Sequence, residues 1–448
     1  MDAPLTPPLP VAGAVTPGDP PHTSQPATAP VAPGTGRTPS ISPTPVWAAQ
    51  VLTFLCSIGT GLVTNGIFFL TEDAYGFTRA QNLLLMLVMG ASYIVGAKGA
   101  GAALRFARRL LPSLSSRAFL MGLMLVMAAL LMLPAIVKPG RDANGGAHGV
   151  WAVWVVVVIY SPLTGVLWPM VESFLSGGRS GKRLRSAIGS WNVVWSGAII
   201  VPYLGLAALV EQSPILAFEL LAGVHVLSAV FLLTFQREPA PHIVEAHEPH
   251  PPVYAELLVV FRMLLPLSYF VYSAMNPLLP SVMRTIGVAP EYRPLLAIAW
   301  LAPRTATFAV LSLWHGWHGK WGSPIAGAAL LLAGFAMTVL SPLLGAGLAV
   351  LGVGLGVIYA GAIYYAMEVG KAEVEAGGTH EALIGLGYTL GPACGLAAGG
   401  VVAGGAVPER WFEVVVVAIV SAVAVGGAGP AVRHARRMSR RAPVTGTA

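Results

Sequence analysis

The sequence predicts an all-α integral membrane protein with twelve transmembrane helices in two pseudo-symmetric six-helix bundles. Three observations predict this fold class: an apolar composition, twelve apolar stretches, and a pattern that repeats between the two halves of the chain. Of the 448 residues, 55% are hydrophobic and 10% are charged, whereas soluble domains carry about 25% charged residues. The chain therefore requires a lipid bilayer around it.

The first 46 residues differ from the rest of the chain. They contain thirteen prolines together with Ser, Thr and Ala, and a single Arg. This composition is typical of a disordered tail, because it offers too little apolar surface to fold. We expect an inert cytoplasmic tail over 1–46, with a partner-binding arm as the alternative.

Twelve stretches approach or exceed the roughly twenty apolar residues that a helix needs to cross a bilayer. They are 47–70, 81–104, 118–137, 150–172, 187–210, 214–236, 256–283, 294–314, 323–341, 344–367, 381–404 and 411–430. The run 323–367 is too long for one helix, and the Ser341-Pro342 break predicts a tight helical hairpin there.

The basic residues predict the orientation. With twelve spans both termini lie on one side, and that side collects seventeen of the Lys and Arg residues outside the spans, against six on the other. Cytoplasmic loops carry the excess of such residues. We therefore expect a multi-pass protein of the cell (cytoplasmic or inner) membrane with both termini in the cytoplasm. The bases lie in short loops, so a nucleic-acid partner is not expected despite the formal charge of +7.

The two halves resemble each other. Glu172 is followed sixteen residues later by Ile188-Gly189, and Glu368 is followed at the same distance by Ile384-Gly385. The pattern predicts an N-terminal bundle over 47–236, a cytoplasmic linker over 237–255, a C-terminal bundle over 256–430 and a basic tail over 431–448. Shared membrane composition is the alternative cause of the likeness.

This plan resembles the major facilitator superfamily over nearly all of residues 47–430. The glycine-proline stretch of span 11, with Gly391-Pro392 at its centre, is similar to a signature of that family, and so are the glutamates that close spans 4 and 10. The loop arginines lack the Asp of the family pattern. The resemblance implies conformational gating by helix bending at Gly391 and Pro392, and by Glu172 and Glu368. It pairs Glu172 with Arg105, Arg108 or Arg109 in one state, and an interfacial Glu that merely meets water is the alternative.

Arg304 is the strongest candidate for substrate binding. It lies near the middle of span 8, about ten residues from either end, where a charge costs at least about 2.5–3.5 kcal/mol. No Asp or Glu is expected at comparable depth. We predict that Arg304 meets an anionic or strongly polar solute, with a structural Arg bonded to Asn or carbonyls as the alternative.

Other polar residues surround this position. Tyr269, Tyr272 and Asn276 share one face of span 7, and Asn276-Pro277 interrupts the helix. Such a break favours a substrate surface with an outer gate at Pro277. Asn65 in span 1 and Asn192 in span 5 complete the predicted set. For the asparagines, hydrogen bonds between helices are an equal alternative.

These features predict a secondary transporter that moves a small polar or anionic solute across the cytoplasmic membrane by alternating access. A channel and a non-transporting receptor or scaffold with a degenerate transporter fold are the alternatives. We expect a monomer with no metal and no cofactor. No catalytic constellation indicates an enzyme, and the absence of a carboxylate at mid-depth leaves the coupling ion undetermined.

Overall fold

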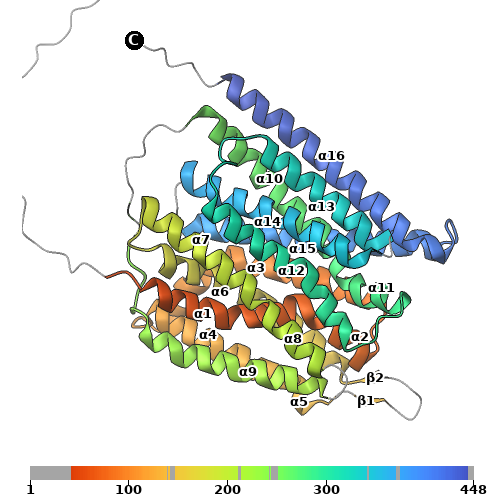
Figure 1. The fold of residues 1–448 in the computed structure, drawn as a ribbon. Coiled ribbons are helices and arrows are strands. Elements are labelled where there is room, and N and C mark those ends of the chain that lie inside the picture. The colour runs from red at the N-terminus through yellow and green to blue at the C-terminus, as the bar shows by residue number, and fades with distance from the viewer. Residues whose placement is uncertain are drawn as a thin grey trace, which may run out of the picture. The chain divides into compact units, whose positions relative to one another are not determined.

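The computed structural model describes residues 42–138, 140–141, 147–209, 213–241, 243, 251–340, 343–369 and 374–441. Residues 1–41 of the predicted tail over 1–46 lie outside the described residues. So do residues 242 and 244–250 of the 237–255 linker and the last seven residues of the basic tail. Long antiparallel helices make up nearly all of the described chain (Figure 1).

The first half of the chain forms six spans from nine α-helices and two short turns of other helix types. Their bounds are α1 Val46–Gly59, η1 Thr60–Gly66, α2 Ile67–Tyr75, α3 Arg79–Leu110, α4 Ser116–Leu131, α5 Leu133–Ile136, α6 Val150–Ser176, α7 Gly181–Ala198, α8 Ile200–Leu209, α9 Pro214–Phe231 and η2 Leu232–Thr234. Between α5 and α6, strands β1 (Gly140–Arg141) and β2 (Ala147–His148) pair antiparallel, with Gly140 opposite His148.

The second half forms the other six spans. Its elements are α10 Pro252–Met275, η3 Asn276–Leu278, α11 Leu279–Thr285, α12 Tyr292–Leu313, α13 Gly322–Leu340, α14 Leu344–Val369, α15 Val374–Ala403, η4 Glu409–Trp411 and α16 Phe412–Arg441. Helix α16 thus continues well into the region predicted as a basic tail.

The predicted spans are confirmed. The described chain contains 12 helices that are long and apolar enough to cross a membrane, and each coincides with one predicted stretch. The largest differences lie where polar residues extend a helix beyond its apolar part. Helix α3 runs to Leu110 through Arg108 and Arg109, and α7 begins at Gly181 before Lys182.

Two spans change helix type along their length, span 1 near its middle and span 7 nearer its C-terminal end. Span 1 passes from α1 through the π-helical turn η1 into α2, and Asn65 stabilises that turn by donating to the Thr60 carbonyl at 2.8 Å. Span 7 breaks at η3, where Pro277 cannot donate a backbone hydrogen bond. The predicted interruption at Asn276-Pro277 is therefore present.

The two halves meet along four spans. Helix α3 packs against α15, and α12 packs against α7 and α8. A Cβ atom at Gly90 of α3 would lie 2.6 Å from the Thr389 backbone nitrogen of α15, so the two backbones touch. Small residues allow such close approach between membrane helices. The two halves of the chain thus share a tight interface, and the division into two bundles remains a prediction.

Because the helices alternate in direction, the loops fall on two sides. We call the side on which α1 begins, α6 ends and α7 begins the arginine-rich side, after its basic loops. The other, where α2 ends and α3 begins, is called the opposite side. These names are used below without reference to the compartments.

Candidate functional site

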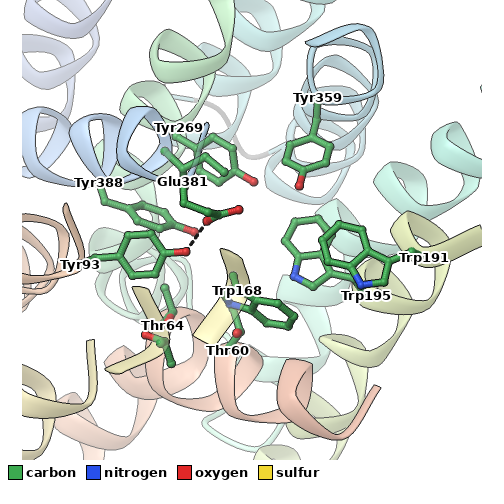
Figure 2. A pocket seen from close by; sticks show the side chains of 12 residues that line it. Thr60, Thr64, Tyr93, Trp168, Trp191, Trp195, Tyr269, Tyr359, Glu381 and Tyr388 are labelled. Atoms are coloured by element: carbon green, nitrogen blue, oxygen red, sulfur yellow. Dashed lines mark hydrogen bonds between the residues drawn. The ribbon is translucent and has the colours of Figure 1, made fainter. Parts of the chain in front are cut away.

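A small central pocket lies between the two halves. Seven aromatic side chains line it, together with Thr60, Thr64 and Thr164, Ile384 and the carboxylate of Glu381 (Figure 2). The aromatic residues are Tyr93, Trp168, Trp191, Trp195, Tyr269, Tyr359 and Tyr388. The pocket volume is about 30 Å³, which is room for one or two water molecules. A larger solute requires side chains to move.

Glu381 is the acidic residue of this pocket. Helix α15 begins at Val374, so Glu381 lies about 10 Å inside the helix, and only 5% of the residue is exposed. Tyr93 of the first half donates its hydroxyl to this carboxylate (Figure 2). A buried carboxylate is costly unless it is hydrogen-bonded, so this bond between the halves holds Glu381 in place. The sequence places Glu381 at the start of span 11 and does not single it out as a buried carboxylate.

A cluster of aromatic rings forms one wall of the pocket. Trp195 of α7 stacks on Tyr359 of α14 with ring centroids 5.2 Å apart and 18° between the planes. Phe308 of α12 packs on both rings, with centroids 6.4 Å from Trp195 and 5.5 Å from Tyr359. The three residues come from both halves. Separation of α7 from α12 and α14 would therefore open the wall.

Beyond this wall lies a larger cavity, which we call the vestibule. It has a volume of about 970 Å³ and is lined by α7, the end of α12 with the following loop, and α14. Phe308 lines the vestibule, whereas Trp195 and Tyr359 line the central pocket. Lys182, Arg185, His315 and His318 also line it, so it opens on the arginine-rich side.

Ion pairs join the halves on the opposite side. Arg284 lies 3.2 Å from the Glu72 carboxylate and Arg293 lies 3.1 Å from that of Asp73. Both acids end span 1, whereas the arginines belong to spans 7 and 8. Arg79 of α3 likewise pairs with Glu409 and Glu413, which precede and begin α16. We call these four pairs the opposite-side latch, because they close that side.

Arg304 is buried but does not line either cavity. Its guanidinium lies 4.7 Å from the ring centroids of both Trp195 and Trp300, and its Nε donates to the Ser196 hydroxyl at 3.1 Å. Its Nη2 has no hydrogen-bond partner within the described chain. The structure thus places Arg304 behind the aromatic wall, bound to groups of the protein.

The predicted polar residues of spans 1 and 7 lie together. Tyr272 donates to the Asn65 side-chain oxygen at 2.5 Å, and Asn276 donates to the Asn65 carbonyl at 3.2 Å. This network joins the halves beside the central pocket. Tyr269 lines the pocket itself, and Asn192 lines the vestibule with its Oδ1 lacking a partner in the described part of the chain.

The predicted gating residues are spread over several places. Glu172 lies against α15, since a Cβ at Gly377 would be 2.8 Å from its Oε2. Arg108 pairs with Glu238, whose carboxylate lies 2.8 Å away, and both Arg105 and Arg109 are exposed. The side chain of Glu368 lies outside the described ones. The pairing of Glu172 with a loop arginine therefore remains a prediction for another state.

The glycine-proline pair of span 11 lies at a close helix contact. Gly391 packs against the Ser273 hydroxyl and the Phe270 carbonyl of α10, and Pro392 lies inside α15. Because any side chain at Gly391 would overlap α10, this contact requires a glycine. A gating role for the pair remains a prediction.

Sequence reasoning missed most of the pocket lining. Trp168, Trp191, Trp195, Tyr359 and Tyr388 look like core or interfacial aromatics as long as the neighbouring helices are unknown. Glu381 stands at the predicted start of span 11, where an acidic residue meets water. One signal is present: Trp191 and Trp195 lie one turn apart on one face of span 5, beside the predicted Asn192.

Comparisons with known proteins show the fold. No protein-family profile and no curated protein matches the chain. Solved structures do match. A structure of a point mutant of the nucleoside transporter NupG aligns with a TM-score of 0.60 at 13% identity, over 88% of this chain and 99% of that one. Another NupG structure has a TM-score of 0.56 at 15% identity, over the same shares. The chain therefore has the major facilitator fold, as predicted.

Proposed function

We propose that this protein is a secondary transporter that moves a small, ring-bearing polar solute by alternating access. One observation carries the proposal. A pocket built from both halves is closed on the opposite side by ion pairs, and it is separated by a single aromatic wall from a cavity on the arginine-rich side. Two bundles that rock about such a midplane site expose it to each side in turn.

The residues that line the central pocket support a ring-bearing polar solute. Aromatic rings bind flat rings by stacking, and hydroxyl groups with one carboxylate can accept and donate hydrogen bonds to polar substituents. Among the described residues the pocket lining has no Lys, Arg or His, which favours a neutral or cationic solute over an anionic one. Nucleosides fit this description, and NupG is named as a transporter of them.

The excess of basic residues supports an orientation. The positive-inside rule puts the arginine-rich side, with both termini, in the cytoplasm of a cell membrane. The vestibule then opens inward and the latch faces outward.

Uptake into proteoliposomes tests this proposal. We expect saturable uptake of radiolabelled uridine, accelerated by unlabelled uridine inside the vesicles. Glu381→Gln and Trp195→Ala should each lower the uptake rate at least tenfold, because they alter the pocket. Trp47→Ala, at a residue that is 58% exposed on α1, serves as the control.

Three outcomes would contradict the proposal. Flux that rises linearly with concentration would indicate a channel. Binding without saturable flux would indicate a receptor. If only organic anions were taken up, and if this uptake were lost in Arg304→Lys, the solute would be anionic and Arg304 would belong to its binding site.

A further inference from the structure

The vestibule carries charges opposite to those of the central pocket. Lys182 and Arg185 reach it from the first two turns of α7, and His315 and His318 from the loop after α12. No Asp or Glu belongs to its lining as far as the side chains are described. The central pocket, in contrast, contains a carboxylate and no base among its described lining residues. The two cavities therefore suit ligands of different charge.

We propose that the vestibule is a binding site for a phosphate-bearing organic anion, separate from the solute site of the central pocket. A phosphate group has three acceptor oxygens and up to two negative charges, and it is bound by Lys and Arg donors. The start of α7 adds a second attraction, since backbone N–H groups at a helix N-terminus favour anions.

The position of the two α7 bases supports this site. A cation at the start of a helix is unfavourable, because the N-terminal end of the helix dipole is positive. The sequence nevertheless places Lys182 and Arg185 there, beside a cavity of about 970 Å³. This volume lies within the range of small-molecule sites, about 300–1,000 Å³. An anion in the cavity would meet both basic side chains and the positive end of the helix.

The pKa of His318 reflects the same positive charge. His318 stacks on Tyr364 with ring centroids 4.0 Å apart. Burial, and then His315 and Arg185, lower the pKa of His318 to about 4. A neighbouring cation lowers the pKa of a histidine because it opposes a second positive charge. The imidazole therefore stays neutral at pH 7 and can donate a hydrogen bond to a phosphate oxygen.

Deeper in the vestibule a polar group lacks a partner. Asn192 is 6% exposed, lines the cavity, and has a buried Oδ1 without a hydrogen bond in the described part of the chain. Leaving a buried polar atom unsatisfied costs about 1–3 kcal/mol. Phe308 and Tyr364 add aromatic rings to the same lining. These groups fit the polar organic part of the anion, while the bases hold its phosphate.

The site lies on the route between the pocket and the arginine-rich side. An anion bound there would hold α7 to α12 and α14 and so keep the aromatic wall of Trp195 and Tyr359 closed. We expect it to inhibit transport from the side on which it binds. If the proposed function is right, the phosphorylated form of the solute is the natural candidate, and this identification depends on that function.

Isothermal titration calorimetry of the full-length protein in phosphatidylcholine nanodiscs tests the site. The probes are uridine monophosphate, inorganic phosphate and uncharged uridine. We expect the monophosphate to bind at least tenfold more weakly to the double variant Lys182→Gln/His315→Gln. Arg183→Gln is the matched control, because Arg183 is exposed on the same turn of α7 and does not line the vestibule. It should leave the affinity unchanged.

Three results would overturn the proposal. The first is that neither uridine monophosphate nor inorganic phosphate binds at millimolar concentration, and the second is that Arg183→Gln loses as much affinity as the double variant. The third is that anionic lipid in phosphatidylglycerol nanodiscs abolishes binding of the monophosphate. The last result would identify a lipid headgroup as the occupant. Trp195→Ala should remove uridine binding but keep phosphate binding. A failure of the solute proposal is thereby separated from a failure of the vestibule site.

Discussion

Glu381 and Tyr93 form a buried hydrogen bond between the two halves, and this bond has a dual consequence. It satisfies a carboxylate that is otherwise surrounded by aromatic rings, and it ties α3 to α15 at the centre of the molecule. A solute that binds Glu381 competes with Tyr93 for the same oxygens. Binding would then weaken a contact that holds the halves together.

We predict that Tyr93→Phe lowers the thermal stability of the protein. The substitution leaves the buried Glu381 carboxylate without its donor, which costs about 1–3 kcal/mol. The melting temperature, followed by tryptophan fluorescence in detergent, measures the effect. Glu381→Leu in the Tyr93→Phe background should recover part of the loss, because it removes the unsatisfied charge.

Tyr388→Phe provides the control for this prediction, since it removes a hydroxyl from the same pocket that has no bond to Glu381 in the described structure. Equal destabilisation by Tyr93→Phe and Tyr388→Phe would show that the hydrogen bond contributes nothing specific.

Single residues are the hardest features to predict from the sequence. Tyr269 is found because its spacing with Tyr272 and Asn276 defines one helix face, and the structure places it in the pocket. Trp195 and Tyr359 meet only through the packing of α7 on α14, which no local pattern encodes. For Arg304 the sequence indicates burial but not the surrounding rings of Trp195 and Trp300.

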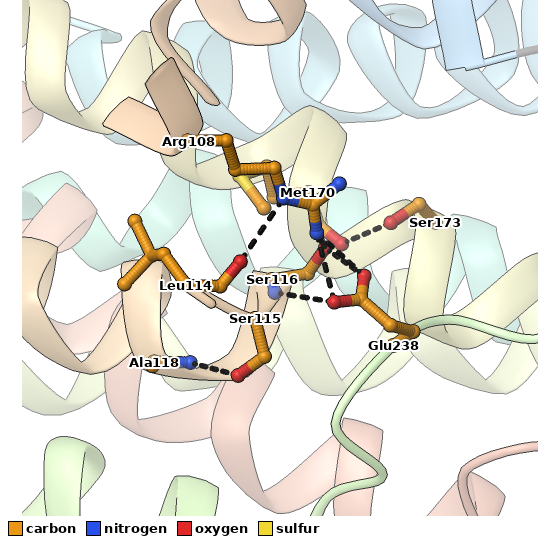
Figure 3. A network of polar contacts seen from close by, with 8 residues as sticks. All are labelled: Arg108, Leu114, Ser115, Ser116, Ala118, Met170, Ser173 and Glu238. Carbon is orange, nitrogen blue, oxygen red and sulfur yellow. Dashed lines mark hydrogen bonds and ion pairs between the residues drawn. The ribbon is translucent and has the colours of Figure 1, made fainter. Parts of the chain in front are cut away.

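Among the elements, one carboxylate joins α3 and α4 to the chain after α9. Glu238 accepts from Arg108 at 2.8 Å and from the Ser116 hydroxyl at 2.6 Å and backbone at 3.1 Å (Figure 3). Ser115 caps α4 by accepting from the Ala118 backbone. The network thus fixes the turn between α3 and α4 to the chain that leaves the first bundle.

We predict that Glu238 makes stability depend on pH. Partial burial raises the pKa of Glu238, but the bonds from Ser116 and Arg108 lower it more, so the net pKa lies below the ordinary value of 4.5. A depressed carboxyl pKa stabilises the fold above the unfolded pKa, and the contribution is lost as the pH falls through the folded pKa. The stabilisation is thus present at pH 7.

Thermal unfolding at pH 7 and at pH 3.5 measures this dependence. Glu238→Gln should lose about 0.5–1 kcal/mol at pH 7, since the pair is more than one third exposed, and the difference from the native protein should shrink at pH 3.5. Glu256→Gln removes a carboxylate from the start of α10 and serves as the control. A difference that stays constant with pH would refute the assignment.

The elements themselves are predictable because a bilayer leaves few choices. Every backbone polar group in lipid must be satisfied within a helix, so each apolar stretch forms one span, including the hairpin split near Pro342. The π-helical turn η1 is not predicted. It depends on the Asn65 side chain bonding back to Thr60, and an Asn in a span is equally suited to contacts between helices.

For the whole molecule, the sequence predicts two related bundles because the repeated Glu and Ile-Gly pattern keeps one spacing in both halves. The conformation is not predictable in this way, since it depends on contacts between residues far apart in the chain. Glu72 and Asp73 pair with Arg284 and Arg293 from the other half, and the vestibule opens on the other side. The structure is thus closed at the latch and more open at the arginine-rich side.

We predict that the opposite-side latch sets the balance between the two open states. Asp73→Arg removes the partner of Arg293, whose side chain is only 7% exposed, and adds a like charge beside it. Breaking a largely buried pair costs about 3–5 kcal/mol, so the closed arrangement should lose population. Maleimide labelling of Ser281→Cys in a Cys56→Ser/Cys394→Ser background reports this, because Ser281 is buried on α11 near the latch.

Labelling of Ser281→Cys should rise several-fold in Asp73→Arg and fall again in the charge swap Asp73→Arg/Arg293→Asp, which restores an ion pair with reversed polarity. The swap distinguishes a latch from general damage, because damage would accumulate rather than cancel. Unchanged labelling in Asp73→Arg would mean that this ion pair is not needed to keep this side shut, and that the other latch pairs and the close packing of α3 on α15 suffice. If labelling and uptake both recover in the swap, the ion pair between the halves controls access to the central pocket.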